Sequence, residues 1–461
     1  MITTIPQLET YLDAYSAFQT TAPGRDLGWL RKLRDDAFAR FCEVGFPTTH
    51  DEDWRFTNVS AIAKTPFRLA TTAGQLNKND LAAWAFPGAA CQLVFVDGHF
   101  VRELSSVNLS QKGVTVASLA DAISTNPASL EPHLGRYLNT ERDAFAALNT
   151  AFAADGAFIH VKKSVVVDQT IHLLFVSTAS DVPTMTHPRN LIVAEEQSQV
   201  AVVEDYVSLG SAIAFCNTAT ELVAGESAVV SHYMIEREDT QAFNISTLRI
   251  QQGRSANVAT HSVLLGGGLV RNNVHPVLAG EGAECLINGL FIGSGRQHLD
   301  NYMLVEHASP HCESRQFYNG ILDGQSHGVF HGRIIVHKDA QKTDAKQTNR
   351  NLLLSDDAQI ETKPQLEIYA DDVKCTHGAT IGQIDETALF YLRSRGIDER
   401  SARKLLLLAF ANECLDRMKE DGVRSHLQKL INRHLFGMAN AVSIAPTEPS
   451  GDKGRNWEEV G

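Results

Sequence analysis

The chain has 461 residues, 43% of them hydrophobic, and a net charge of −13 from 41 basic and 54 acidic side chains. This length predicts two or three domains, and the composition is that of a folded globular protein. An acidic surface repels phosphate backbones, which argues against nucleic-acid binding.

The chain shows no sign of membrane insertion or export. No apolar run approaches the roughly 18 residues that a membrane-spanning helix needs. The first residues lack the layout of a signal or transit peptide. Seven scattered cysteines without a C-x-x-C pair are typical of a reducing compartment. We therefore expect a cytoplasmic protein that does not bind membranes.

An N-terminal helical or mixed domain is predicted over residues 1–157. Apolar residues recur at helical spacing from Leu27 to Phe41, and Gly45 ends the pattern. A weaker helical pattern covers residues 8–18, and further helices are expected between 118 and 154. Residues 93–101 predict two strands around an Asp-Gly turn.

Residues 158–384 predict a right-handed parallel β-helix. Short apolar strands alternate with a recurring turn, and the third residue of that turn falls at 198, 227, 255, 282, 311, 326 and 358. Most steps are 27 to 32 residues and one is 15, which indicates a unit near fourteen residues with two strands to a full repeat. A β-sandwich is the competing fold, but a near-constant step favours a solenoid of stacked coils.

Histidines are frequent in this region, and two of them could form a metal site. His327 and His331 would share one face of a strand. Because no carboxylates stand in register with them, we favour partly buried members of polar ladders instead. No phosphate-binding loop, nucleophile elbow or dinucleotide fingerprint occurs in the sequence. We therefore predict a protein that is not an enzyme, with any ATP chemistry supplied by a partner.

The C-terminal region is predicted to be helical over residues 385–440, with a flexible tail over 441–461. Asp385 and Asp398 are suited to cap two helices, and a third is expected over 426–434. The stretch from Leu405 to Phe410 is apolar nearly all round. Such a helix is either packed between elements or docked onto another protein.

Cys375 and His377 stand where the strand pattern gives way to helices. Residues two apart share one strand face, so a thiol and an imidazole would point the same way. Thiolate and imidazole are both good ligands for iron. A buried core thiol beside a histidine that caps a carbonyl fits the same residues. The residues by themselves leave both interpretations open.

Several longer motifs resemble the SufB/SufD family of iron–sulfur cluster assembly scaffolds. They are Asp53-Trp-Arg-Phe-Thr57, His331-Gly-Arg-Ile-Ile-Val336, Gln347-Thr-Asn-Arg-Asn-Leu-Leu-Leu-Ser355, Lys363-Pro-Gln-Leu-Glu-Ile368, Lys374-Cys-Thr-His-Gly-Ala-Thr-Ile-Gly382 and Leu389-Phe-Tyr-Leu-Arg-Ser-Arg-Gly-Ile397. The Cys-x-His-Gly form at 375–378 is similar to the SufD branch. The resemblance implies a β-helix core flanked by helical domains.

The same resemblance implies partners and a site. SufD-like proteins pair with SufB through their β-helices, and the ABC-type ATPase SufC docks on the C-terminal helices, here through Leu405, Leu408 and Phe410. A nascent Fe–S cluster would be built at the interface of the pair, where SufB contributes the main cysteine and this subunit contributes His377 with Cys375 beside it. The resemblance also implies a flavin in the assembled complex only, and a homodimer is an open possibility for the isolated chain.

Two other functions fit a β-helix. One is a carbohydrate-active enzyme such as a polysaccharide lyase, which needs clustered acidic and basic groups on one solenoid face and usually export. The other is a purely structural homo-oligomeric solenoid. The helical C-terminal region and the cytoplasmic composition favour the assembly subunit over the lyase.

Overall fold

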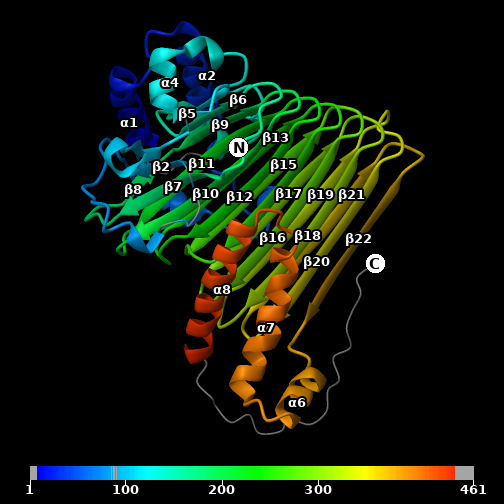
Figure 1. The fold of residues 1–461 in the computed structure, drawn as a ribbon. Helices are drawn as coiled ribbons and strands as arrows, with labels where there is room; N and C mark the ends of the chain where they lie inside the picture. The colour runs from blue at the N-terminus through cyan, green and yellow to red at the C-terminus, as the bar shows by residue number, and fades with distance from the viewer. Residues whose placement is uncertain (1–7, 85, 87–88, 90, 110, 442–461) are drawn as a thin grey trace.

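A computed structural model describes residues 8–84, 86, 89, 91–109 and 111–441 of the chain. Its centre is a flattened parallel β-solenoid made of two 11-stranded sheets that face one another (Figure 1). N-terminal helices lie at the start of the solenoid, and two of the three C-terminal helices lie along one of its faces. The predicted parallel β-helix with helical flanks is therefore confirmed.

The two sheets are called A and B here, and the chain alternates between them from β9 onward. Sheet A contains β1 (Arg68–Leu69), β5 (Val114–Ser118), β6 (Ala157–Val161), β8 (Thr184–Thr186), β9 (Arg189–Ala194), β11 (Ala214–Ala224), β13 (Phe243–Gln252), β15 (Leu269–Leu278), β17 (His298–His307), β19 (His327–Val336) and β21 (Gln359–Ile368). Sheet B contains β2 (Cys91–Val96), β3 (His99–Phe100), β4 (Ser106–Val107), β7 (Ile171–Thr178), β10 (Gln199–Leu209), β12 (Val229–Arg237), β14 (Asn257–Leu264), β16 (Glu284–Gly293), β18 (Glu313–Leu322), β20 (Asp344–Leu353) and β22 (Lys374–Gly382).

Each coil contributes one strand to each sheet, as the sequence repeat predicts. Between β10 and β22, paired residues on successive coils are 26 to 32 positions apart. The shortest step is Phe243 to Leu269, and the longest is His327 to Gln359. This register keeps alternate side chains of every strand inside the solenoid, where each coil covers the apolar face of the last.

The recurring turn is a stacked column of residues with left-handed backbone. Positive φ values occur two residues before each sheet-B strand from β10 to β20, at Gln197, Ser227, Ser255, Gly282, His311 and Lys342. Each of these residues donates its backbone N–H to a carbonyl in the next turn, as Ser227 does to Arg254. The predicted turn positions 326 and 358 lie on the opposite side, before sheet-A strands, which explains the one short step.

Most of the N-terminal helices cover the outer face of sheet A near its first coils, whereas the 3₁₀ turns at Ala82–Trp84 and Arg102–Leu104 pack on sheet B. They are α1 (Leu8–Thr21), α2 (Gly28–Val44), η1 (Glu52–Trp54), α3 (Ser60–Lys64), η2 (Ala82–Trp84), η3 (Arg102–Leu104), α4 (Leu119–Thr125), η4 (Pro127–Ser129) and α5 (Ala144–Ala151). Phe41 and Phe145 join Phe215 of β11 in one buried cluster. The predicted helices over 8–18 and 27–41 and the strand pair around Asp97-Gly98 are all present.

Two of the three C-terminal helices cover the outer face of sheet B, and the first of the three packs on the second. They are α6 (Glu386–Ser394), α7 (Glu399–Leu415) and α8 (Asp421–Ala441), and α7 crosses β16 and β18 (Figure 1). Asp385 and Asp398 cap α6 and α7 as predicted. α8 is longer than the predicted 426–434. The tail predicted to be flexible lies outside the described residues after position 441. No helix in the described part of the chain is long and apolar enough to cross a membrane.

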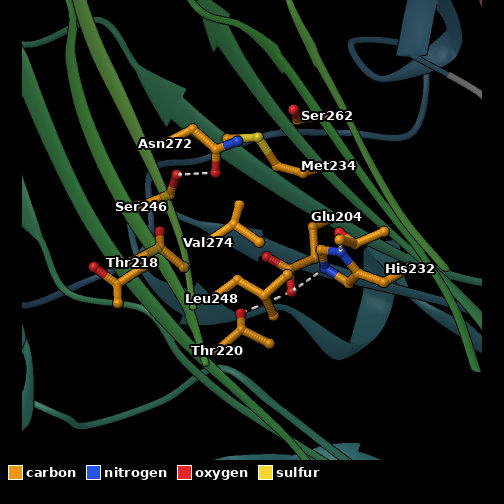
Figure 2. A pocket seen from close by; sticks show the side chains of 12 residues that line it. Glu204, Thr218, Thr220, His232, Met234, Ser246, Leu248, Ser262, Asn272 and Val274 are labelled. Atoms are coloured by element: carbon orange, nitrogen blue, oxygen red, sulfur yellow. Dashed lines mark hydrogen bonds and ion pairs between the residues drawn. The ribbon is translucent and has the colours of Figure 1, made fainter. Parts of the chain in front are cut away.

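The interior of the solenoid is mostly apolar but holds a buried polar network between β10, β11 and β12 (Figure 2). Glu204 accepts hydrogen bonds from Thr220 Oγ1 (2.7 Å) and Tyr206 Oη (2.6 Å), and His232 Nε2 lies 3.1 Å from the same carboxylate. A cavity of ≈ 10 Å³ beside them has room for about one water molecule. These contacts satisfy a carboxylate that is 3% exposed, so the network is a structural element of the core.

Candidate functional site

The candidate site lies on β22, the last strand of sheet B. β22 pairs with β20 on one side, and no other described strand pairs with it on the other. The last strand of sheet A, β21, likewise pairs only with β19 among the described strands. Among the described residues the solenoid therefore ends in two free strand edges, whose N–H and C=O groups are open to pairing with another chain.

Cys375 is the inner, half-buried member of the predicted pair. It stands in register with Ala345 on β20, which is 1% exposed and belongs to the solenoid core. Cys375 itself packs against that core. Burial raises the pKa of the Cys375 thiol. At neutral pH this group is a thiol and not the thiolate that binds iron well.

His377 is exposed although it lies on the same strand face as Cys375. It stands in register with Gln347, which is 1% exposed and points into the solenoid. His377 lacks this cover because no further coil of the chain follows β22 within the described residues. The structure thus brings both predicted donors together at the open end of the solenoid, with the imidazole accessible.

Two donors cannot hold a metal centre alone. In the described ranges, no group of three or more His, Cys, Asp or Glu side chains is arranged to bind a metal ion. Iron–sulfur clusters generally take four protein ligands, with histidine replacing cysteine in some centres. The thiol and imidazole fit iron in their chemistry but leave the coordination incomplete. A metal centre at this pair would need further ligands from outside the described part of this chain.

Exposed apolar side chains surround the free edges. Ile368 is 40% exposed, Tyr369 is 63% exposed, and Ile381 on β22 is 39% exposed. These residues lie at the end of β21, just after it, and on β22, on either side of the open end. Large apolar groups gathered beside unpaired strands are typical of an interface with another protein.

The structure separates the three residues predicted to contact an ATPase. Leu405 on α7 is 48% exposed and Leu408 is half-buried. Phe410 is 9% exposed, and its backbone carbonyl accepts a hydrogen bond from Asn319 Nδ2 of β18 over 2.8 Å. The apolar stretch therefore has a buried side that packs on sheet B, which accounts for Phe410, and an exposed side that includes Leu405.

Two further exposed aromatic residues lie on α6, which contacts α7, and neither was predicted as a docking residue from the sequence. Phe390 is 73% exposed and Tyr391 is 56% exposed. Only Leu389 of α6 is buried. The available signal was the run of apolar residues from 388 to 392, which is wider than one packed helix face requires.

His327 and His331 lie on the outer face of sheet A, whereas Cys375 and His377 lie on the inner face of sheet B. His327 Nδ1 is 3.1 Å from His298 Nδ1, and His331 packs edge-on against Tyr302. Burial lowers the pKa of both imidazoles. They are members of a packed row of polar and aromatic residues, as we favoured from the sequence. The nearby Trp54 is also a packing residue, because the Arg271 guanidinium carbon lies 3.8 Å from the centre of its ring.

Comparison with known families matches almost the whole chain. The SufBD core domain of the SUF system for FeS cluster assembly matches residues 175–410, and the SufBD protein N-terminal region matches residues 6–173. An iron–sulfur cluster assembly SufBD family protein of Synechocystis is 34% identical over 425 residues, covering 90% of this chain and 93% of the relative.

Two relatives carry the SufD name. The iron–sulfur cluster assembly protein SufD of Escherichia coli is 31% identical over 408 residues, covering 86% of this chain and 91% of that protein. SufD of Bacillus subtilis is 26% identical over 331 residues, covering 71% of this chain and 75% of that protein. The chain belongs to the SufB/SufD family of iron–sulfur cluster assembly proteins, and its relatives support the SufD branch.

Proposed function

We propose that this chain is the SufD-like subunit of a cytoplasmic SUF scaffold and supports a nascent Fe–S cluster at an interface with a SufB-like protein. The observation that carries the proposal is the Cys-x-His pair on an unpaired edge strand. A donor pair on a free edge becomes part of a complete site when another chain adds its own ligands. The cluster is the cargo of this site and is passed on, and a flavin is expected only in the assembled complex.

In this proposal His377 is the first ligand and Cys375 is secondary. His377 is accessible at the open end, and a neutral imidazole binds iron without losing a proton. The Cys375 thiol is half-buried and its raised pKa disfavours the thiolate. The accessible imidazole is therefore the better donor from this chain.

The partner would pair with the free edges of β21 and β22. Backbone hydrogen bonds along an edge strand give affinity, and Tyr369 and Ile381 would be buried by the contact. In the absence of a partner, the same edges offer a surface to a second copy of this chain. This subunit would supply ligands and shape without catalysing a reaction.

A SufC-type ATPase would dock on the exposed side of α6 and α7. Phe390, Tyr391 and Leu405 form this surface, with the half-buried Leu408 at its border. Phe410 acts indirectly, because it holds α7 on sheet B. ATP hydrolysis in the docked subunit would then act close to β22, since α6 follows β22 in the chain.

The test is co-expression of this chain with a SufB-like protein and a SufC-type ATPase. We expect the three to co-purify, and His377→Ala to lower the iron and sulfide content of the complex without changing its subunit composition. Lys374→Ala, also on β22 but at a residue outside the proposed ligand pair, is the matched control. Unchanged iron and sulfide in His377→Ala would refute the ligand role.

Docking is tested separately with Phe390→Ser and Leu405→Ser, which should weaken co-purification of the ATPase alone. Surface variants are preferable to removal of the C-terminal helices, because truncation would uncover the apolar face of sheet B. Retention of the ATPase by the double variant would place its contact elsewhere on the chain.

A further inference from the structure

A short ladder of amide side chains lies next to His377 on the inner face of sheet B. Gln316 on β18 pairs in register with Gln347 on β20, and Gln347 pairs with His377 on β22. Gln347 Nε2 donates a hydrogen bond to Gln316 Oε1 over 2.9 Å. The two glutamines are 2% and 1% exposed. The ladder therefore runs along the solenoid axis and stops one step before His377.

Each end of this ladder has an unused polar atom. Gln316 Nε2 and Gln347 Oε1 are buried, and neither has a hydrogen-bond partner among the described residues. The step beyond Gln316 is Ile287, which offers no polar group. The step beyond Gln347 is His377, whose ring carries N–H. Because Nε2 is committed to Gln316, the carbonyl oxygen of the same amide is directed away from Gln316.

Gly332 on the opposite sheet makes room for the Gln347 amide. A Cβ at position 332 would lie 1.9 Å from Gln347 Nε2 and 2.7 Å from Cδ. The amide thus occupies the volume that any side chain at 332 would fill. Confined on this side and hydrogen-bonded to Gln316, Gln347 has little freedom to turn its carbonyl elsewhere.

We propose that Gln347 is the positioning residue for His377: its Oε1 accepts the N–H of one ring nitrogen and leaves the other nitrogen unprotonated, facing out of the open end. A neutral imidazole has one donor and one acceptor nitrogen, so fixing the donor fixes the acceptor. Histidines that bind metals commonly donate their second N–H to a carbonyl or carboxylate, which orients the ring. The inference rests on the proposed function for the role of His377, whereas the hydrogen bond requires this chain alone.

The test is the tautomer of His377 in the full chain labelled with ¹⁵N-histidine. Long-range ¹H–¹⁵N spectra distinguish protonated from unprotonated ring nitrogens, and His377→Gln identifies the signals. In the unaltered chain we expect a single tautomer. Gln347→Met, similar in length but without an acceptor, should give a mixture of both tautomers. Gln347→Glu, which keeps an acceptor oxygen, should restore the single tautomer.

Identical His377 signals in the unaltered chain and in Gln347→Met would overturn the proposal. A wild-type tautomer mixture would overturn it too. The remaining histidines report on folding, and if Gln347→Met disturbs them, Gly332→Ala becomes the deciding variant. That change displaces the amide while keeping Gln347, and it should also release the tautomer.

The outcome is separable from the ligand role of His377. A tautomer fixed by Gln347, together with unchanged iron in His377→Ala, would sustain this inference and refute the cluster-binding role. A tautomer independent of Gln347, together with iron lost in His377→Ala, would do the reverse.

Discussion

Phe410 and Leu405 stand five residues apart on α7 and should respond to substitution in opposite ways. Phe410 is 9% exposed on the α7 side that packs on sheet B, and Leu405 is 48% exposed. Truncating a buried phenylalanine to alanine costs about 3–5 kcal/mol. The Arg350 guanidinium, 5.6 Å from the Phe410 ring centre, would lose a further contribution of about 0.5 kcal/mol. Leu405→Ala should change stability by less than about 0.5 kcal/mol.

The assay is hydrogen exchange of the α7 and α8 amides, because these helices dock as one layer on sheet B. We expect Phe410→Ala to lower their opening free energy by about 3 kcal/mol or more, which is over a hundredfold faster exchange. Exchange in Leu405→Ala should match the unaltered chain, while its capture of the ATPase falls. Equal effects of the two variants on exchange would refute the assignment of buried and exposed sides of α7.

Three further predictions concern the solenoid. Gly282 has φ 71°, and an added Cβ would meet Ser255 Oγ at 3.6 Å, an ordinary van der Waals distance. Gly282→Ala should therefore lower the free energy of unfolding by about 1 kcal/mol through backbone strain, seen as a lower urea midpoint, and an unchanged midpoint would contradict the left-handed turn. Arg271→Leu leaves the Asp300 carboxylate buried without its cation and should lower the free energy of unfolding by about 3–5 kcal/mol, measured by the same urea midpoint. A loss below about 1 kcal/mol would mean that the buried Asp300 carboxylate does not need Arg271. Burial lowers the pKa of His307 to about 4, below the value of about 6.5 in the unfolded chain. The folded state therefore favours the neutral imidazole, and its contribution to stability is complete above about pH 6.5 and is lost as the pH falls toward about 4. His307→Gln, which can keep the hydrogen bond to Ser314, should therefore reduce the slope of unfolding free energy against pH between 7 and 5, and an unchanged slope would show that His307 does not titrate as argued.

The coil architecture was predictable because one turn geometry recurs at a fixed spacing. Ser227, Ser255, Gly282 and His311 all adopt the left-handed backbone two residues before a sheet-B strand. The spacing of this turn in the sequence therefore gives the number of residues in one coil. The buried Glu204–His232 network was not predictable, since both residues are far apart in sequence and are joined only by the register between β10 and β12.

The site was predictable only in part, for a related reason. Two-residue spacing is enough to place Cys375 and His377 on one strand face. His377 is exposed and Cys375 is half-buried because no further coil follows β22 among the described residues. The spacing of the two residues does not reveal where the solenoid ends. Likewise, a stretch that is apolar nearly all round predicts that α7 has a second apolar side besides the one packed on its own fold. It does not reveal which residues lie on which side. The position of Gln347 beside His377 follows from strand register, which the quoted motifs do not contain.

The central claim is that another chain completes the site along the free edge of β22, and hydrogen exchange of residues 374–382 tests it most directly. On adding the SufB-like partner, the β22 amides that point away from β20 should become protected, together with those of β21, while β10 and β12 in the middle of sheet B remain unchanged. Unaltered exchange along β22 in a complex that has otherwise formed would contradict a site shared across this edge.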